Sequence, residues 1–92
     1  MARNDKRIDV YLALDSERDY QDAGRGNAKR HEGRPELTVG EHILILEKLV
    51  ADARVEWYKP DGRNTAIEHM RKIGGVAVRC MELYGAPLRE PA

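Results

Sequence analysis

The sequence predicts an all-α protein with a short N-terminal helix followed by two long antiparallel helices. Residues 38–58 and 64–84 each repeat apolar side chains at the spacing of an amphipathic helix. Between them, Pro60-Asp61-Gly62 is typical of a turn, and a short turn makes the two helices antiparallel neighbours. The 92 residues are expected to form a single domain, 1–92, that assembles with copies of itself as a homo-oligomeric helical bundle.

The first helix is expected from about Arg7 to Gln21. Apolar residues alternate between positions 8 and 14, as they do in a strand, but the stretch then continues without a breaker into a polar segment that lacks strand character. A helix accounts for both halves. It places four residues near one face: Tyr11, Leu14, Arg18 and Gln21. Arg18 could pair with Glu17 or Asp22, and residues 1–6 are polar and expected to fray.

Residues 22–37 are expected to form a long basic loop, because they contain three glycines, one proline and many charges. Loops of this length are usually functional or disordered. Three of its cations could form a flap or a second site for an anion: Arg25, Lys29 and Arg30. A solvated, flexible loop is the equally weighted alternative.

The second helix is expected to begin after Thr38 and to end near Tyr58. Thr38 and Glu41 fit a capping box, in which each side chain bonds a backbone N–H of the other residue. The expected core stripe consists of Val39, His42 or Ile43, Leu46, Leu49 or Val50, Ala53 and Trp57. The run 43–46 is apolar on all sides, which predicts contact from more than one direction and therefore an oligomer.

The third helix is expected to have Asn64 as its N-cap and to end at Gly85, with Pro87 blocking any continuation. Gly74 and Gly75 lie in its interior, where each glycine costs about 1 kcal/mol relative to alanine. Such a pair indicates that another backbone passes close by. We expect this face to lie near an interface between copies, in an assembly of at least two chains.

Cations on this third helix are candidates for binding an anion such as a phosphate. Lys72 and Arg79 lie seven residues apart and share a face, while Arg71 lies about 100° away. Beside the turn, aromatic, amide and guanidinium groups could stack on a purine and bond its edge. These groups are Tyr58, Arg63 and Asn64. A solvated charge is the preferred interpretation for any one of these cations. Trp57 also flanks the turn, and for it a core position is preferred.

Composition narrows the class of function. The 16 basic and 16 acidic side chains cancel, so a general role in wrapping nucleic acid is not expected. Cys80 is the only cysteine, which excludes an intramolecular disulfide and a cysteine-based zinc site. The sequence begins with polar residues and has no long apolar run, so we expect a cytoplasmic protein that does not enter a membrane.

Two blocks of the chain resemble a known family. The sequence ERDYQD at 17–22 and the sequence HMRKIGGVAVRCMELYGAPLR at 69–89 are similar to the Thoeris anti-defence sponges, small phage proteins that sequester nucleotide immune signals. The resemblance covers about a third of the chain. It implies a phage or prophage protein in the host bacterial cytoplasm that binds glycocyclic ADP-ribose without cleaving it. Some relatives also bind cyclic oligonucleotides at a second site.

The resemblance, taken with the cations and aromatics above, gives a set of expected ligand-binding residues: Arg71, Lys72, His69, Arg79, Tyr58, Asn64 and Arg63. Arg71 is the leading expected phosphate contact, because it lies in the Arg-Lys motif of the second block. No cofactor and no metal are expected.

The first block also occurs in phage proteins related to all-α nucleoside triphosphate pyrophosphohydrolases, which hold Mg²⁺ with carboxylates spaced three residues apart. That spacing is missing here, because Glu41 is followed by Leu44 and Glu47 by Val50. We therefore expect no enzymatic activity. The alternative function is a structural or partner-binding helical module that is a non-catalytic relative of those enzymes.

Overall fold

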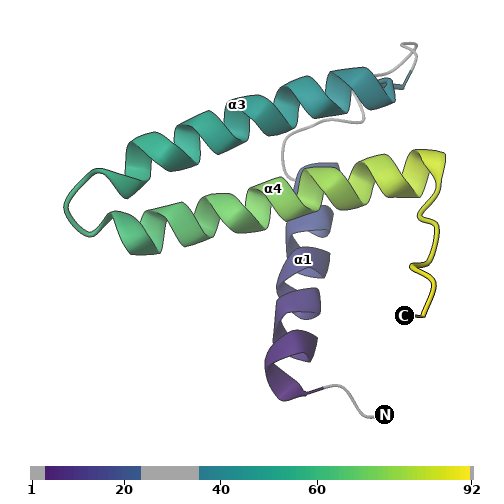
Figure 1. Cartoon of the computed structure of the whole chain (residues 1–92), viewed down its shortest axis with the longest axis horizontal. Helices are drawn as coiled ribbons and strands as arrows, with labels where there is room; N and C mark the ends of the chain where they lie inside the picture. Colours follow the sequence, from purple (N-terminus) through teal and green to yellow (C-terminus); the bar gives the residue numbers. More distant parts are fainter. Residues whose placement is uncertain (1–3, 24–35, 92) are drawn as a thin grey trace.

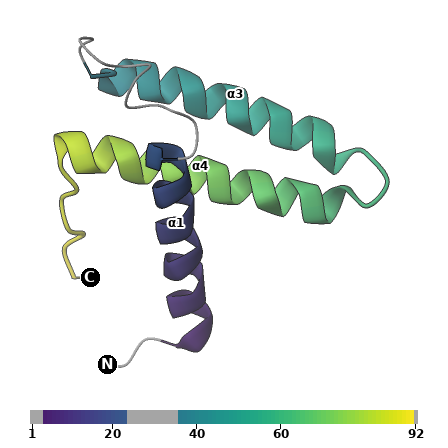
Figure 2. The ribbon, with the colours of Figure 1, turned by 180° about the vertical axis from the view of Figure 1, so that it is seen from behind.

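The computed structural model describes residues 4–23 and 36–91, and all regular structure within them is helical. Helix α1 spans Asp5–Ala23, α3 spans Val39–Trp57 and α4 spans Gly62–Tyr84. In Figure 1, α3 and α4 lie side by side and are joined by a turn at one end, while α1 lies across the middle of α4. Figure 2 shows the same arrangement from behind, and α1 approaches α4 but not α3. The predicted all-α fold is confirmed for the described residues.

Helix α1 confirms the first predicted helix and extends it by two residues at each end. The Asn4 side chain accepts a hydrogen bond from the backbone N–H of Arg7 at 2.8 Å, which satisfies one of the free donors of the first turn. Asp22 and Ala23, which were expected to begin the loop, belong instead to this helix. Most of the predicted loop lies outside the described residues. This part includes its three candidate cations, Arg25, Lys29 and Arg30.

The start of α3 is the predicted capping box. The Thr38 side chain accepts from the Glu41 backbone at 3.1 Å, and the Glu41 carboxylate accepts from the Thr38 backbone at 2.9 Å. The hydrogen bond from the Thr38 backbone N–H stabilises the ionised carboxylate, and it is the largest cause that lowers the pKa of Glu41. Because the pattern is local in sequence, it could be read before the structure was known.

The face of α3 that packs on α4 differs in part from the predicted stripe. His42 and Ala53 are buried, and Leu46 and Leu49 are half-buried. Trp57, however, is 60 % exposed, so the expectation that it belongs to the core is wrong for the single chain. The buried or half-buried positions 42, 49, 53 and 56 follow one another at helical spacing, and Trp57 lies about 100° further round the helix than Glu56.

The turn between α3 and α4 fixes where α4 begins. Asp61 adopts the left-handed conformation, with φ of 61°, and the Gly62 N–H donates to the Lys59 carbonyl at 2.9 Å. A side chain at Gly62 would collide with the carbonyl oxygens of Glu56 and Trp57, so only glycine fits there. The helix therefore starts at residue 62, and the predicted Asn64 N-cap is wrong. Asn64 lies in the first turn.

The close approach predicted from the glycine pair is confirmed, but its partner lies within the same chain. A Cβ at Gly75 would lie 2.6 Å from the Gln21 amide nitrogen and 2.7 Å from Glu17 Cγ, and one at Gly74 would collide with the Leu14 side chain. The face that we expected at an interface between copies is thus filled by α1. At its other end α4 finishes as predicted, with Gly85 at φ of 105°.

Candidate anion-binding site

The segments 17–22 and 69–89, which lie on α1 and largely on α4, pack against each other. Glu17 and Arg18 come from the first block on α1, and they pair with Arg71 and Glu82 of the second block on α4. These two pairs lie on either side of the glycine pair where α1 crosses α4. These four charged side chains therefore hold the two helices together, which is a structural role.

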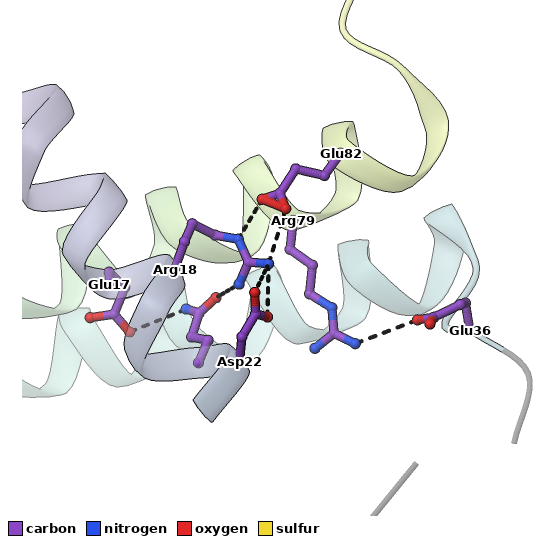
Figure 3. A network of polar contacts seen from close by, with 7 residues as sticks. Glu17, Arg18, Asp22, Glu36, Arg79 and Glu82 are labelled. Atoms are coloured by element: carbon purple, nitrogen blue, oxygen red, sulfur yellow. Dashed lines mark hydrogen bonds and ion pairs between the residues drawn. The ribbon is translucent and has the colours of Figure 1, made fainter. Parts of the chain in front are cut away.

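Arg18 is the centre of this polar network (Figure 3). Its guanidinium donates to both oxygens of Glu82, at 2.6 and 3.2 Å, to the Gln21 carbonyl at 3.0 Å and to Asp22 at 2.9 and 3.1 Å. The Arg18 side chain is only 9 % exposed, and its carboxylate partners satisfy the charge that burial would otherwise penalise. The hydrogen bond from Arg18 holds the pKa of Glu82 below its usual value.

The second pair is built around a buried carboxylate. The Glu17 side chain is 6 % exposed, and it accepts from Arg71 Nε at 2.9 Å and from the Gln21 amide at 3.2 Å. Gln21 links both pairs, because its carbonyl accepts from Arg18 while its amide donates to Glu17. Arg71 is 41 % exposed at its side chain, so part of its guanidinium faces solvent.

A pocket of about 220 Å³ lies where α1 and α3 face each other above α4. Since α1 and α3 do not approach one another directly, this pocket is the space between them. Its walls are formed by Glu17, Tyr20, Gln21, Leu37, His42, Ile45, Leu49, Lys72, Val76 and Arg79. Apolar side chains from α3 and α4 form one part of the lining, and polar groups form the other.

Two cations of α4 line this pocket together. Lys72 and Arg79 lie on the same helix face, as their seven-residue spacing predicted, and both are half-buried. Figure 3 shows Arg79 directed toward Glu36, and the closest nitrogen and oxygen of that pair are 3.6 Å apart. This is a loose ion pair, so Arg79 retains hydrogen-bonding capacity for an anion.

His42 gives the pocket a buried imidazole. The ring is 1 % exposed, and its Nδ1 lies 2.8 Å from the Thr38 carbonyl oxygen. Because a carbonyl can only accept, Nδ1 must carry a hydrogen, and Nε2 of the neutral ring is then an acceptor. Within the described residues Nε2 has no hydrogen-bonding partner. Buried polar atoms are normally satisfied, so this nitrogen marks a place where a ligand or water is expected.

The residues predicted to bind a ligand fall into three groups. Lys72 and Arg79 meet at the pocket, whereas Arg71 pairs with Glu17 and does not line it. His69 does not line the pocket either, and its Nδ1 lies 3.1 Å from the Thr65 carbonyl oxygen.

The third group lies at the turn, beyond one end of the pocket. Tyr58 is 80 % exposed, Asn64 donates to Asp61 at 3.1 Å, and Arg63 lines a separate surface hollow with Trp57. From Lys72 back to Asn64 the helix rises by about 12 Å. The structure therefore does not bring the turn residues and the pocket cations into one site.

Sequence reasoning did not find the pocket walls contributed by α1 and by His42. Glu17 and Tyr20 belong to the motif at 17–22, but no sequence signal indicated that they would lie near Lys72. The signal for His42 was its place on the α3 stripe, where it competed with Ile43 for the buried position. Burial of a histidine in preference to an adjacent isoleucine favours a polar role at that point.

Other features of the described residues are negative findings. In residues 4–23 and 36–91, no three histidine, cysteine or acidic side chains are grouped as a metal would require. Across the same ranges, no helix combines the length and the apolar character needed to cross a membrane. Comparison with known proteins found no matching family model, curated protein or solved structure.

Proposed function

We propose that this protein binds a nucleotide of the cyclic ADP-ribose type through its phosphates and sequesters it without cleaving it. One observation carries the proposal: Lys72 and Arg79 line the same pocket and can donate to phosphate oxygens. The buried His42 beside them presents an acceptor, Nε2, which has no partner among the described residues and suits a hydroxyl of the ligand. The similarity of residues 17–22 and 69–89 to the Thoeris anti-defence sponges supports the same reading. The protein would then act in the cytoplasm of a phage-infected bacterium.

The chemistry of the pocket supports a phosphate-bearing ligand. Ammonium and guanidinium groups form charge-assisted hydrogen bonds with phosphate oxygens, which are stronger than bonds between neutral groups. Apolar side chains of the lining, such as Ile45 and Leu49, exclude water and strengthen those bonds. Tyr20 adds an aromatic ring to the wall, and a base could pack against it.

The volume bears on which part of such a ligand is held. About 220 Å³ is below the range of about 300–1,000 Å³ that encloses most drug-sized ligands. It suits a pyrophosphate group, with the remainder of the nucleotide lying across the rim. Binding without cleavage is proposed because the glutamates of α3 lack the paired carboxylates that pyrophosphohydrolases use for Mg²⁺.

The test is calorimetric titration of cyclic ADP-ribose isomers, and separately of inorganic pyrophosphate, into the wild type and three variants. Lys72→Ala and Arg79→Ala should each weaken binding by about 10- to 100-fold, because a hydrogen bond to a charged group contributes about 1.5–3 kcal/mol. Lys59→Ala is the matched control, since Lys59 lies at the turn and pairs with Glu56. Equal affinities for all four proteins would refute the site.

A second measurement tests sequestration. Nucleotide that is bound and then released by heating should have an unchanged mass. Release of nucleoside monophosphate and pyrophosphate would instead show a hydrolase.

The alternative proposal is a structural or partner-binding module, in which two antiparallel helices pack with other chains and no nucleotide is held. The small core favours it: among the described residues, Ala53, at 8 % exposure, is the only apolar side chain that is buried. Assembly as a homo-oligomer is part of both proposals. Nucleotides that remain unbound to a well-folded oligomer would select this alternative.

A further inference from the structure

Helix α3 presents a second face, opposite to α4, that nothing in the described chain covers. Its exposed residues include Ile43 at 50 % and Val50 at 55 %, and Tyr58, the C-cap that follows the helix, is 80 % exposed. A shallow surface groove runs along this helix and is lined only by its own residues: Ile43, Leu46, Glu47, Val50, Ala51 and Arg54. A helix normally buries one apolar stripe, so a second stripe indicates a second neighbour.

The residues of this face repeat at helical spacing. Positions 43, 47, 50, 51, 54 and 58 fall within a sector of about 100° of the helix, at about 100° per residue. We call this sector the outer face of α3. It points well away from His42 and Ala53, which pack on α4.

Two charges on the outer face identify its neighbour. Glu47 and Arg54 lie about two turns apart, beyond the i,i+4 reach of a helical ion pair, and neither has an ion-pair partner in the described part of the chain. The midpoint between them falls between Val50 and Ala51. A two-fold axis through that midpoint would place Glu47 of each copy opposite Arg54 of the other.

We infer that the outer face of α3 binds the outer face of α3 in a second copy of this chain, with the two helices antiparallel. The pairing forms two reciprocal Glu47–Arg54 ion pairs. It sets Val50 against Ala51, where a small side chain lets the helices approach, and it sets Ile43 against Tyr58. An isologous contact of this kind is how most homodimers close.

The charge pattern selects against the other orientation. In a parallel pair, Glu47 would face Glu47 and Arg54 would face Arg54, and like charges in register repel. A partner of different sequence would need its own matching charges, whereas a second copy supplies them. The inference concerns assembly alone, so it can hold or fail independently of the nucleotide site.

The experiment uses two charge reversals in the full chain, Glu47→Arg and Arg54→Glu. Each variant alone places two like-charge pairs in the interface and should weaken dimerisation by at least about tenfold. An equimolar mixture of the two variants restores both attractive pairs, so it should form a heterodimer as stable as the wild-type dimer. The double variant, Glu47→Arg with Arg54→Glu, should also dimerise like the wild type.

Light scattering over a dilution series gives the masses to compare with the 10.5 kDa of one chain, and circular dichroism shows that each variant is helical. Failure of one single variant to fold would leave the double variant as the test. A wild type that is monomeric at tens of micromolar overturns the inference. So does a dimer that either reversal leaves unchanged, or a pair of variants that do not restore assembly when mixed.

Discussion

Replacing Arg71 with methionine should lower the free energy of unfolding by about 2 kcal/mol, although Arg71 is 41 % exposed. The reason is its partner, since the Glu17 side chain is only 6 % exposed. Removing the arginine leaves an ionised carboxylate whose one remaining donor, within the part of the chain that the structure describes, is Gln21. Breaking a fully buried pair costs about 3–5 kcal/mol, and we take roughly half because solvent reaches this pair from the arginine side.

The assay is urea unfolding followed by circular dichroism, at one fixed protein concentration because assembly adds to stability. For a domain of this size, about 2 kcal/mol corresponds to a fall in melting temperature of about 8–16 °C. A second substitution, Glu17→Gln, should recover at least about 1 kcal/mol in the Arg71→Met background, because it removes the stranded charge. A single variant as stable as the wild type, or further loss in the double variant, would refute the reasoning.

The same pair of variants separates two roles of Arg71. If the double variant is folded and binds cyclic ADP-ribose like the wild type, Arg71 acts through Glu17 and does not contact the ligand. If binding is lost in that folded background while Glu17→Gln alone binds like the wild type, the expected phosphate contact at Arg71 is supported, because Glu17 itself lines the pocket. A measurement of stability without one of ligand binding could not distinguish these two roles of Arg71.

The remaining predictions concern the junction of α1 and α4. Gly75→Ala should destabilise the protein by about 1 kcal/mol despite the better helix propensity of alanine, because its Cβ would lie 2.7 Å from Glu17 Cγ. The control is Gly40→Ala, which lies on an open surface near the start of α3. It should not lower the free energy of unfolding in the same urea assay. The hydrogen bond from Arg18 lowers the pKa of Glu82, so its stabilisation is complete above the ordinary value of 4.5 and is lost as the pH falls through the lower folded-state pKa. Glu82→Gln should therefore flatten the acid side of a plot of stability against pH, and an unchanged acid limb would contradict the pairing.

Local chemistry explains which parts of the fold could be predicted. The capping box at Thr38 depends on residues three apart, and the end of α4 depends on the backbone freedom of Gly85, so both can be read from short segments. The start of α4 could not. Asn64 has the composition of an N-cap, but the tight reversal requires Asp61 in a left-handed conformation and places the helix start earlier.

The spacing of apolar residues does not show which other element packs against a helix face. The spacing of Gly74 and Gly75 predicted a close helix contact, but a contact within the chain and a contact between copies give the same pattern. The Glu17–Arg71 pair joins residues 54 positions apart, so no local signal marks it. The sequence ranked Arg71 above Lys72 as a ligand contact because of the Arg-Lys motif in the second block. In the structure Arg71 pairs with Glu17, and Lys72 lines the pocket.

The position of α1, which packs on α4 and approaches no other described helix, has a consequence for cooperativity. An element with one neighbour opens at lower free energy than a hairpin whose helices support each other along their length. Amide hydrogens of α1 should therefore exchange with solvent through partial opening, while those in the middle of α3 and α4 exchange only through global unfolding. A molecule seated between α1 and α3 would give α1 its second neighbour. Protection of the α1 amides would then report occupancy of the pocket directly.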